Sequence, residues 1–326
     1  MIHETIMSAG AARLLYVAAK LDIADLLADG PLSSEHLAAH LNAHQTTLYR
    51  LLRGLVACGI LGEREDGRFE LLPDGRALRR DVEDSQWRTV MQWGEMIDKA
   101  MDGLLHAVYT GETPFDHVFG MSVWEYRSRN PAIGRIFHNN VAAATARIVP
   151  ALLKACDFTS TRRLVDVGGG QGALIGGILR AHPQAHGVLF EKYPEGAQDT
   201  LAVLGVAPRC EIRAGDFFAE VPADGDCYLL KAVIHDWNDE ECVRILKNVR
   251  AAMLKEGRLL LLERCLPKRA EAGSETVFSD ILMLVLEHGR ERTESELRGL
   301  LADAGFTTVR SLVIDINDAC LLEATA

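Results

Sequence analysis

Apolar residues recur every three to four positions through most of residues 1 to about 150, a spacing that predicts amphipathic helices. Two adjacent segments, 33–42 and 46–57, predict short helices, and Ser33 and Ser34 are suited to begin the first of them. The following run GILGEREDGRFELLP predicts two short strands joined by a type I′ turn at Asp66-Gly67. Helix, helix and hairpin in this order predict a winged helix-turn-helix.

From about residue 162 the pattern changes to short apolar runs that alternate with helical segments. This alternation is typical of βαβ units and predicts an α/β fold with an open, mostly parallel sheet. The capping-box pairs Asn238/Glu241 and Thr293/Glu296 predict the starts of two of its helices. In such a sheet the ligand site lies at the carboxyl ends of the strands. The predicted strands are 163–168, 187–191, 211–213, 226–231, 258–263, 308–314 and 319–323, and the first is followed by a helix over 173–182.

Charge decides against a DNA-binding role for the winged module. The chain of 326 residues carries a formal net charge of −11, with 25% charged and 48% hydrophobic residues, so it is also neither fibrous nor wholly disordered. Residues 1–80 hold nine Lys or Arg and ten Asp or Glu, and the would-be recognition helix offers only Arg50 and Arg53. Phosphate neutralisation, which supplies most non-specific DNA affinity, is largely missing. Dimerisation or a substrate-lid role is therefore favoured for this module.

No membrane span and no signal peptide are expected. No run approaches the roughly 18 apolar residues that a span needs, and the N-terminus lacks a basic segment followed by an apolar one. The seven cysteines are odd in number and form no CxxC pair, which argues against a disulfide framework or a zinc site. We expect reduced thiols in a cytoplasmic enzyme. The cysteines are Cys58, Cys156, Cys210, Cys227, Cys242, Cys265 and Cys320.

A glycine-rich turn follows the first strand of the sheet. Gly168, Gly170 and Ala173 satisfy the dinucleotide fingerprint GxGxxG/A, so NAD is one possible ligand. Asp166 at the strand tip disfavours a pyrophosphate and suits a ligand that carries an ammonium and a sulfonium, which favours S-adenosylmethionine. Glu191, which ends the second strand, is placed to accept hydrogen bonds from ribose hydroxyls of either cofactor.

Five blocks, in order, carry a family resemblance over nearly the whole chain: VDVGGGQG, GDFF, LLKAVIHDWNDEECVRILKNVRAAM, LLLLERCLP and GRERTESELRGLLADAGF. They resemble the class I S-adenosylmethionine-dependent small-molecule O-methyltransferases of the plant caffeic acid and bacterial polyketide type. The resemblance implies a Rossmann-like methyltransferase sheet and a homodimer formed through the winged-helix domain. It assigns residues 1–100 to dimerisation and 101–326 to the S-adenosylmethionine-binding domain, with 101–155 as linking and substrate helices.

The resemblance also assigns cofactor contacts. Gly168 would contact the methionine portion, Lys231 its carboxylate and Glu191 the ribose, and the glycine loop would include Asp166 and Gly170. Asp216 and Phe217 would hold the adenine. Glu191 departs from the family, which more often has Asp there, so the longer acid must shift by a methylene.

His235, just beyond the fourth strand, is the predicted general base. Methyl transfer needs an acceptor oxygen that has lost its proton, and a phenol has a pKa near 10, so a nearby base assists. Glu263 ends the fifth strand and Glu291 lies before the helix opened by Thr293, so both are expected to flank the base. Asp236 follows His235 directly and is expected to point elsewhere.

The acceptor pocket is predicted from the interdomain helices and the catalytic edge. The family usually has methionine where Val141 stands and glycine where His288 stands, so the substrate cannot be named by analogy. The candidates are Met91, Trp93, Phe137, His138, Val141, Trp237, Met283 and His288.

Other functions are weighed against this prediction. His235, Glu263, His288 and Glu291 have no metal-ligand spacing, so no metal is expected. The rivals are a relative that hydroxylates or decarboxylates a polycyclic substrate, an N-methyltransferase, an NAD-dependent oxidoreductase and a DNA-binding regulator.

Overall fold

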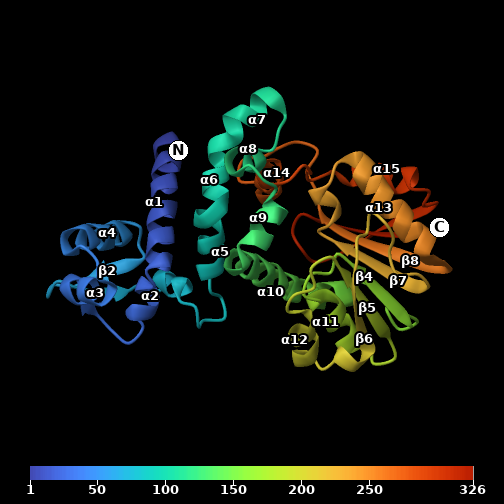
Figure 1. The fold of residues 1–326 in the computed structure, drawn as a ribbon, viewed down its shortest axis with the longest axis horizontal. Helices are drawn as coiled ribbons and strands as arrows, with labels where there is room; N and C mark the ends of the chain where they lie inside the picture. The colour runs from blue at the N-terminus through green and yellow to red at the C-terminus, as the bar shows by residue number, and fades with distance from the viewer. Residues whose placement is uncertain (326) are drawn as a thin grey trace. The chain divides into compact units, whose positions relative to one another are not determined.

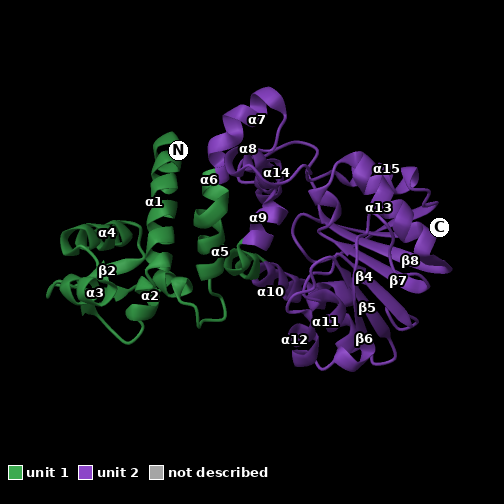
Figure 2. Ribbon diagram, viewed as in Figure 1, with its two compact units in different colours: residues 1–99, 130–137 green, residues 100–129, 138–326 purple. Residues whose placement is uncertain are grey.

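The structure is a computed structural model in which residues 1–325 are described, and it divides into two compact units (Figure 2). The first comprises residues 1–99 and 130–137, and the second residues 100–129 and 138–326. The second unit therefore holds the whole seven-stranded sheet and the helices that lie between its strands in the chain (Figure 1). Among the described residues, no helix combines the length and the apolar character needed to cross a membrane.

The first unit is mostly helical, with a small antiparallel sheet in the order β1-β3-β2. Leu37 of α3 and Leu52 of α4 are fully buried in its core, as the helical spacing predicts, and Phe69 of β3 is buried with them. Its elements are α1 (Ile2–Lys20), α2 (Ile23–Leu26), β1 (Leu32–Ser33), α3 (Ser34–Leu41), α4 (Gln45–Ala57), β2 (Leu61–Glu63), β3 (Arg68–Leu71), a 3₁₀ turn (Asp74–Leu78), α5 (Trp87–Gln92) and a π-helical turn (Trp93–Ile97).

The winged-helix outline predicted for this unit is confirmed, with one correction at the hairpin. Ser33 begins α3 by accepting a hydrogen bond from the His36 N–H at 3.2 Å. The turn between β2 and β3 is not type I′, which needs left-handed φ at both central residues. Only Gly67 has that conformation, with φ 76°, and the Arg64 N–H closes the loop on the Arg68 carbonyl at 2.8 Å. The loop is longer than the predicted two residues, so one left-handed residue suffices.

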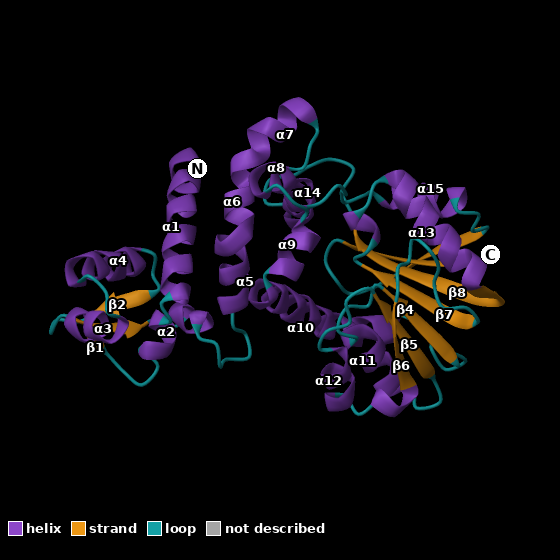
Figure 3. Cartoon of the chain, viewed as in Figure 1, coloured by secondary structure: helices purple, strands orange, loops and turns teal. Residues whose placement is uncertain are grey.

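The second unit is built on a seven-stranded sheet in the order β6-β5-β4-β7-β8-β10-β9 (Figure 3). Strands β4 to β8 pair in parallel, and β10 pairs antiparallel with both β8 and β9. This is the predicted Rossmann-like class I methyltransferase sheet, and all seven predicted strands form. They are β4 (Arg163–Val167), β5 (His186–Glu191), β6 (Cys210–Ala214), β7 (Gly225–Lys231), β8 (Met253–Arg264), β9 (Thr308–Leu312) and β10 (Ala319–Thr325).

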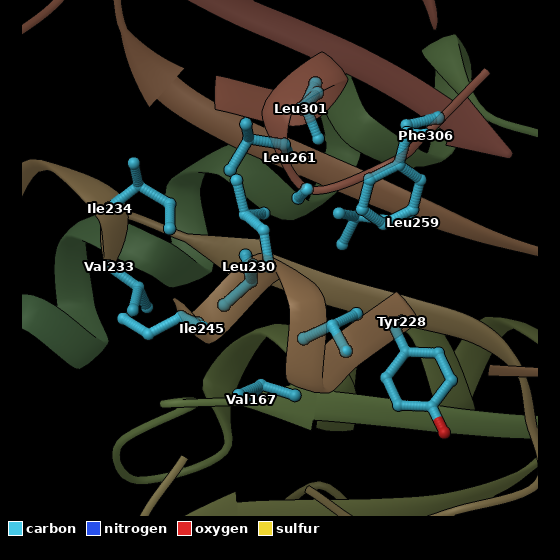
Figure 4. Close-up of a cluster of buried hydrophobic side chains, with 14 of the residues drawn as sticks. Val167, Tyr228, Leu230, Val233, Ile234, Ile245, Leu259, Leu261, Leu301 and Phe306 are labelled. Atoms are coloured by element: carbon cyan, nitrogen blue, oxygen red, sulfur yellow. The ribbon is translucent and has the colours of Figure 1, made fainter. Parts of the chain in front are cut away.

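Helices cover both faces of this sheet, which explains why its strands are continuously apolar. Neighbouring residues of a strand enter different cores: Leu229 packs with α11 and α12, and Leu230 packs with α13 and α15. Figure 4 shows part of the second core, with Val167, Leu230, Leu259 and Leu261 from the strands, Ile245 from α13 and Leu301 from α15. Along the chain after α5, the helices are α6 (Asp98–Ala100), α7 (Leu104–Thr110), α8 (Pro114–Phe119), α9 (Val123–Arg129), α10 (Pro131–Ala155), α11 (Ala173–Ala181), α12 (Ala197–Val203), α13 (Asp239–Ala252), α14 (Glu275–Leu286) and α15 (Glu294–Asp303). Most of α6 and the start of α10 belong to the first unit.

Two cysteines form a disulfide, so the prediction of seven reduced thiols is wrong for this pair. Cys265 follows β8 and Cys320 lies in β10, with 5.5 Å between their Cα atoms. Antiparallel pairing of β8 with β10 brings together residues that are 55 positions apart in the sequence, and no local motif announces that pairing. The other five cysteines are free. A cytoplasmic location stays a prediction, without the support that reduced thiols lent it.

Candidate active site

The glycine loop between β4 and α11 lies directly against the Asp166 carboxyl group. A Cβ atom at Gly169 would come 2.5 Å from the Asp166 carboxyl, so only glycine fits there without displacement. Gly170 has φ 57°, and the space beside its Cα is open. The loop therefore exposes its backbone at the carboxyl end of β4, where a ligand of this fold is expected.

Asp166 is buried beneath this loop, with 1% of its surface exposed. Its Oδ2 atom has no hydrogen-bond partner among the described residues. Burial raises the pKa of this carboxyl to about 7, against the Ile175 N–H and the Lys231 charge, which favour the anion. A buried carboxyl with an unsatisfied oxygen suits a ligand with a positive charge or N–H donors.

Glu191 ends β5 and faces the same loop. Its carboxylate accepts hydrogen bonds from the backbone N–H groups of Gly170 at 3.0 Å, Lys192 at 2.8 Å and Tyr193 at 3.3 Å. The glutamate side chain, which is one methylene longer than aspartate, therefore contacts the glycine loop. These three donors also fix the direction of the carboxylate.

The residues predicted to hold adenine adjoin this loop. A Cβ atom at Gly168 would lie 3.7 Å from the Phe217 ring, so the ring borders the glycine turn. Asp216 accepts a hydrogen bond from the Phe218 N–H at 2.9 Å, and its other oxygen lies 3.5 Å from Lys192 Nζ. The Asp216 carboxylate is thus oriented by its own turn.

Lys231, at the end of β7, lies between the cofactor loop and the catalytic acids. Its Nζ donates to Thr145 Oγ1 of α10 at 3.2 Å. Burial lowers the pKa of Lys231, while the charges of Glu263 and Asp166 oppose that change. The lysine therefore connects the two groups of acids electrostatically.

His235 lies on a 3₁₀ turn, Ile234–Asp236, immediately after β7, and 16% of its side chain is exposed. Its Nδ1 atom is 3.2 Å from Glu291 Oε1 and 3.9 Å from Glu263 Oε2. The other oxygen of Glu263 accepts from the N–H groups of Val233 at 3.0 Å and Ile234 at 2.8 Å. The structure thus brings His235, Glu263 and Glu291 together, and Glu263 also fixes the backbone that leads into His235.

Asp236 does not point away from His235 as expected. Its Oδ1 lies 3.4 Å from His235 Nε2, because consecutive side chains on a 3₁₀ turn are only about 120° apart, unlike those of a strand. Burial lowers the pKa of His235, but the charges of Asp236, Glu291 and Glu263 outweigh it and raise that pKa to about 10. The imidazole is consequently protonated at neutral pH in this structure.

Two further charged residues of the site were not found from the sequence. Glu287, after α14, is buried, and its Oε1 lies 3.7 Å from Arg127 Nη1. Burial and the neighbouring Asp236 charge raise the pKa of Glu287 well above its ordinary value. Nothing in a single Glu before His288 signals burial, so the sequence alone could not identify it.

Arg292 is the second of these residues, with 2% of its surface exposed. Its guanidinium donates to the carbonyls of Ile234 at 2.9 Å and Trp237 at 2.7 Å, on either side of His235, and to Asp239. Gly289 packs on the same turn, since a Cβ atom there would lie 1.9 Å from the His235 carbonyl oxygen. Segment 289–292 therefore supports the turn that carries the predicted base.

The predicted acceptor residues are divided between the two units. His138, Val141, Trp237, Met283 and His288 belong to the second unit, and Met91, Trp93 and Phe137 to the first. The Trp237 ring contacts Phe217 and Phe218 edge-on and packs against the sheet core. His288 is 64% exposed at its side chain and bonds to Thr113 and Asp116, not to His235. Burial lowers the pKa of His138.

One group of side chains has the composition of a metal site. Ligand atoms of His235, Glu263 and Glu291 all lie within 4.8 Å of one another, and His288 is not among them. A metal would have to displace the proton that these carboxylates hold on His235.

Comparison with known proteins agrees with this arrangement. Residues 101–307 match the model of the O-methyltransferase domain, and residues 4–79 match the O-methyltransferase dimerisation domain. The chain belongs to the O-methyltransferase family. A phenazine O-methyltransferase, PhzM, of Lysobacter antibioticus is 41% identical to this methyltransferase over 303 residues, which cover 91% of this chain and 88% of the relative. A phenazine-1-carboxylate N-methyltransferase of Pseudomonas aeruginosa is 35% identical, over 96% of this chain and 93% of its own.

Solved structures share the fold of this methyltransferase throughout. The mitomycin 7-O-methyltransferase MmcR superposes with a TM-score of 0.94 and 34% identity, over 99% of this chain and 96% of that one. The neocarzinostatin O-methyltransferase NcsB1 superposes with a TM-score of 0.86 and 28% identity, over 97% and 96%, in a complex with S-adenosylmethionine and a hydroxynaphthoic acid. S-adenosylmethionine is the cofactor of this family.

Proposed function

We propose that this methyltransferase moves a methyl group to the hydroxyl of a small aromatic metabolite, with His235 as general base. The observation that carries the proposal is the contact of His235 Nδ1 with Glu291 Oε1 at 3.2 Å, beside the cofactor loop. Glu291 makes the shorter contact, at Nδ1, and Asp236 Oδ1 lies 3.4 Å from Nε2, so Nε2 is the nitrogen proposed to take the acceptor proton. Relatives and neighbours named for phenazine, mitomycin and naphthoic acid chemistry support an aromatic acceptor.

The cofactor-binding residues are Asp166, Gly168, Gly170, Glu191, Asp216, Phe217 and Lys231. The unsatisfied Asp166 oxygen and the open backbone of Gly170 fit S-adenosylmethionine, which carries an ammonium and a sulfonium. When bound, it supplies an electrophilic methyl group. Three of the groups have defined tasks: Glu191 accepts from the ribose hydroxyls, Lys231 faces the cofactor carboxylate, and the Phe217 ring covers the adenine.

The acids around His235 serve the proton transfer. Glu291 fixes the imidazole ring and stabilises it once it has gained the acceptor proton. Glu263 orients the turn through the N–H groups of Val233 and Ile234. The Asp236 carboxylate lies beside Nε2 of His235 and adds negative charge at that nitrogen. No metal has a part in this mechanism.

The proposal also covers the oligomeric state and the residues that contact the acceptor. The match to the dimerisation domain supports a homodimer formed through the first unit. From the sequence candidates in the second unit, we retain His138, Val141 and Met283 as acceptor contacts. Trp237 and His288 are weaker candidates, because one packs in the core and the other bonds to Thr113 and Asp116.

The first experiment is mass spectrometry of hydroxylated aromatic compounds incubated with the enzyme and methyl-labelled S-adenosylmethionine. A product with the label on oxygen is expected. A product that gains oxygen or loses carbon dioxide without the label would instead show the polycyclic hydroxylase or decarboxylase chemistry of the divergent relatives.

We expect His235→Ala to lower turnover sharply and to leave cofactor affinity nearly intact, because the imidazole moves the acceptor proton and does not touch the glycine loop. Turnover with saturating acceptor and calorimetric titration with S-adenosylmethionine measure the two effects separately. Full activity in this variant would contradict the role of His235 as general base. The close approach of acceptor and cofactor would then be the whole mechanism.

N-methylation is the second candidate, favoured by the match to the phenazine-1-carboxylate N-methyltransferase. Fragmentation of the labelled product distinguishes a methyl group on nitrogen from one on oxygen. This alternative is established if a compound whose only nucleophiles are nitrogen atoms is methylated with a higher kcat/KM than the hydroxylated compounds.

A further inference from the structure

Glu291 holds two partners with a single oxygen atom. Its Oε1 accepts a hydrogen bond from Ser279 Oγ of α14 at 2.7 Å and contacts His235 Nδ1 at 3.2 Å. Its Oε2 is buried and has no hydrogen-bond partner among the described residues. Glu291 itself is fully buried. The orientation of this carboxylate therefore depends on the two donors that share Oε1.

The residue next to Ser279 holds the backbone of the same glutamate. Asp280 Oδ1 accepts a hydrogen bond from the Glu291 N–H at 2.9 Å. Two consecutive residues of α14 thus fix Glu291, one at its carboxylate and the other at its main chain. This double attachment matters because Glu291 lies outside any helix or strand, between α14 and α15.

The hydroxyl of Ser279 is not used in the manner usual within a helix. A serine in the middle of a helix often bonds to the carbonyl four residues earlier. The Ser279 hydroxyl instead donates out of the helix to Glu291. A hydrogen bond to an ionised carboxylate is among the stronger kinds, so it restrains rotation of that group.

The sharing of Oε1 also determines the proton on His235. An ionised carboxylate only accepts hydrogen bonds, so the ring nitrogen that it contacts must carry hydrogen. With Nδ1 bearing hydrogen, the neutral imidazole has its lone pair at Nε2. Burial raises the pKa of Glu291, but the hydrogen bond and charge of His235, followed by the Ser279 hydrogen bond, outweigh burial and lower that pKa, which favours the ionised carboxylate.

We propose that Ser279 is a positioning residue for the methyl transfer reaction, which holds Glu291 Oε1 against His235 Nδ1 and thereby keeps Nε2 as the proton acceptor. The proposal rests on the function proposed above, in which His235 is the base. Ser279 acts through Glu291, to which its hydroxyl donates a hydrogen bond.

The test compares Ser279→Ala with Ser279→Thr and with Ser311→Ala. Ser311, on the edge strand β9, is the matched control, because its hydroxyl also donates to a glutamate, Glu294 of α15. We expect Ser279→Ala to lower the limiting kcat, reached at high pH where the imidazole is neutral, about tenfold, the size of one lost hydrogen bond to a charged group. The KM for S-adenosylmethionine is expected to stay unchanged. Ser279→Thr, which keeps the hydroxyl, restores most of kcat, and Ser311→Ala leaves kcat unchanged.

The pH profile separates positioning from a merely structural role. When Glu291 is no longer held against Nδ1, the imidazolium loses stabilisation, so the rising limb of kcat moves to lower pH in Ser279→Ala. Nitrogen-15 NMR of His235 in the cofactor-free enzyme reports the same change directly, as a lower imidazole pKa and a smaller fraction with hydrogen on Nδ1. Thermal unfolding of each variant shows whether the fold is intact.

Two results would overturn the proposal. In one, Ser279→Ala matches Ser311→Ala in kcat; in the other, kcat falls while the pH profile and the His235 spectrum are unchanged. Failure of the proposed function is a different result, since His235→Ala would then retain full activity.

Discussion

The decisive residue is His235, whose charge is set by the acids around it. Glu291 and Glu263 approach Nδ1, and Asp236 approaches Nε2. Burial disfavours the imidazolium, yet these acids raise the pKa to about 10. An imidazole in this environment is a strong base that is mostly already protonated at neutral pH. Proton transfer from the acceptor therefore depends on the small neutral fraction.

From this shift we predict that kcat rises with pH above neutrality. Only the neutral imidazole accepts a proton, and a raised pKa means that this form grows as pH increases from 7 toward 10. The measurement is kcat at saturating acceptor and S-adenosylmethionine from pH 6 to pH 10. The His235→Ala variant should keep only the part of the rise that comes from ionisation of the acceptor itself. A wild-type profile that is flat above pH 7 would contradict the assignment.

Gly169 offers a second prediction for a single residue. A Cβ atom there would lie 2.5 Å from both the Asp166 carboxyl and Leu189 Cδ1, so Gly169→Ala forces the loop away from β4. We expect a loss of about 1–3 kcal/mol in the free energy of unfolding, as for overpacked cores, and weaker S-adenosylmethionine binding.

Gly299→Ala is the control for that measurement, since Gly299 is helical and no atom of the described residues lies within 4 Å of a Cβ there. Gly299→Ala should raise the free energy of unfolding by up to about 1 kcal/mol. Chemical denaturation and calorimetry test both variants. Equal effects of the two substitutions would mean that the close approach at Gly169 is unimportant.

Among the elements of the fold, the connection from α14 to α15 matters most, because it supports the His235 turn. Arg292 donates to the carbonyls of Ile234 and Trp237 and to Asp239 from full burial. Lysine cannot reproduce this fork of donors. We predict that Arg292→Lys lowers the free energy of unfolding by about 2 kcal/mol, in the range for a broken buried network, and also lowers kcat.

Arg290→Lys is the matched variant for this prediction. Arg290 is 43% exposed at its side chain and pairs with Glu296 and Asp239. Its replacement should change the free energy of unfolding by no more than about 0.5 kcal/mol. Denaturant unfolding and measurement of kcat compare Arg290→Lys with Arg292→Lys. A similar small effect from both would show that Arg292 does not fix the turn.

The elements also show what a sequence can and cannot predict. Asn238 and Thr293 begin α13 and α15 with complete capping boxes, because a cap depends on residues only three positions apart. Contacts that depend on strand order are different. Cys265 meets Cys320 because β10 folds back antiparallel on β8.

The same difference between local and long-range contacts applies to the residues of the candidate site. His235, Glu263 and Glu291 were predicted together, because parallel strands and the loops after them end at one edge of the sheet. The place of Asp236 was missed, because a 3₁₀ turn replaces the strand-like alternation after Lys231. The burial of Glu287 and Arg292 depends on how the 287–292 segment packs, and no local pattern encodes that packing.

At the scale of the whole molecule, charge and the match to known proteins assign the winged unit to association between chains. Its helix α4 has few cations, and the chain carries a net charge of −11, so binding to duplex DNA is disfavoured. Residues 4–79 match the O-methyltransferase dimerisation domain. Helix α1 carries large apolar side chains on its surface, with Ile2 80%, Ile6 64% and Met7 59% exposed. Exposed apolar side chains grouped on one helix are typical of a protein interface.

We therefore predict that the enzyme sediments as a dimer, at twice the chain mass of 35.8 kDa. A charge introduced into an apolar interface must be desolvated without a partner, so Ile6→Asp combined with Met7→Glu should shift the population toward monomer. Val203→Glu is the control, because Val203 lies on α12 of the second unit and is 87% exposed. Sedimentation equilibrium measures the three proteins. A monomeric wild-type enzyme, or a double variant as dimeric as the control, would contradict an interface at α1.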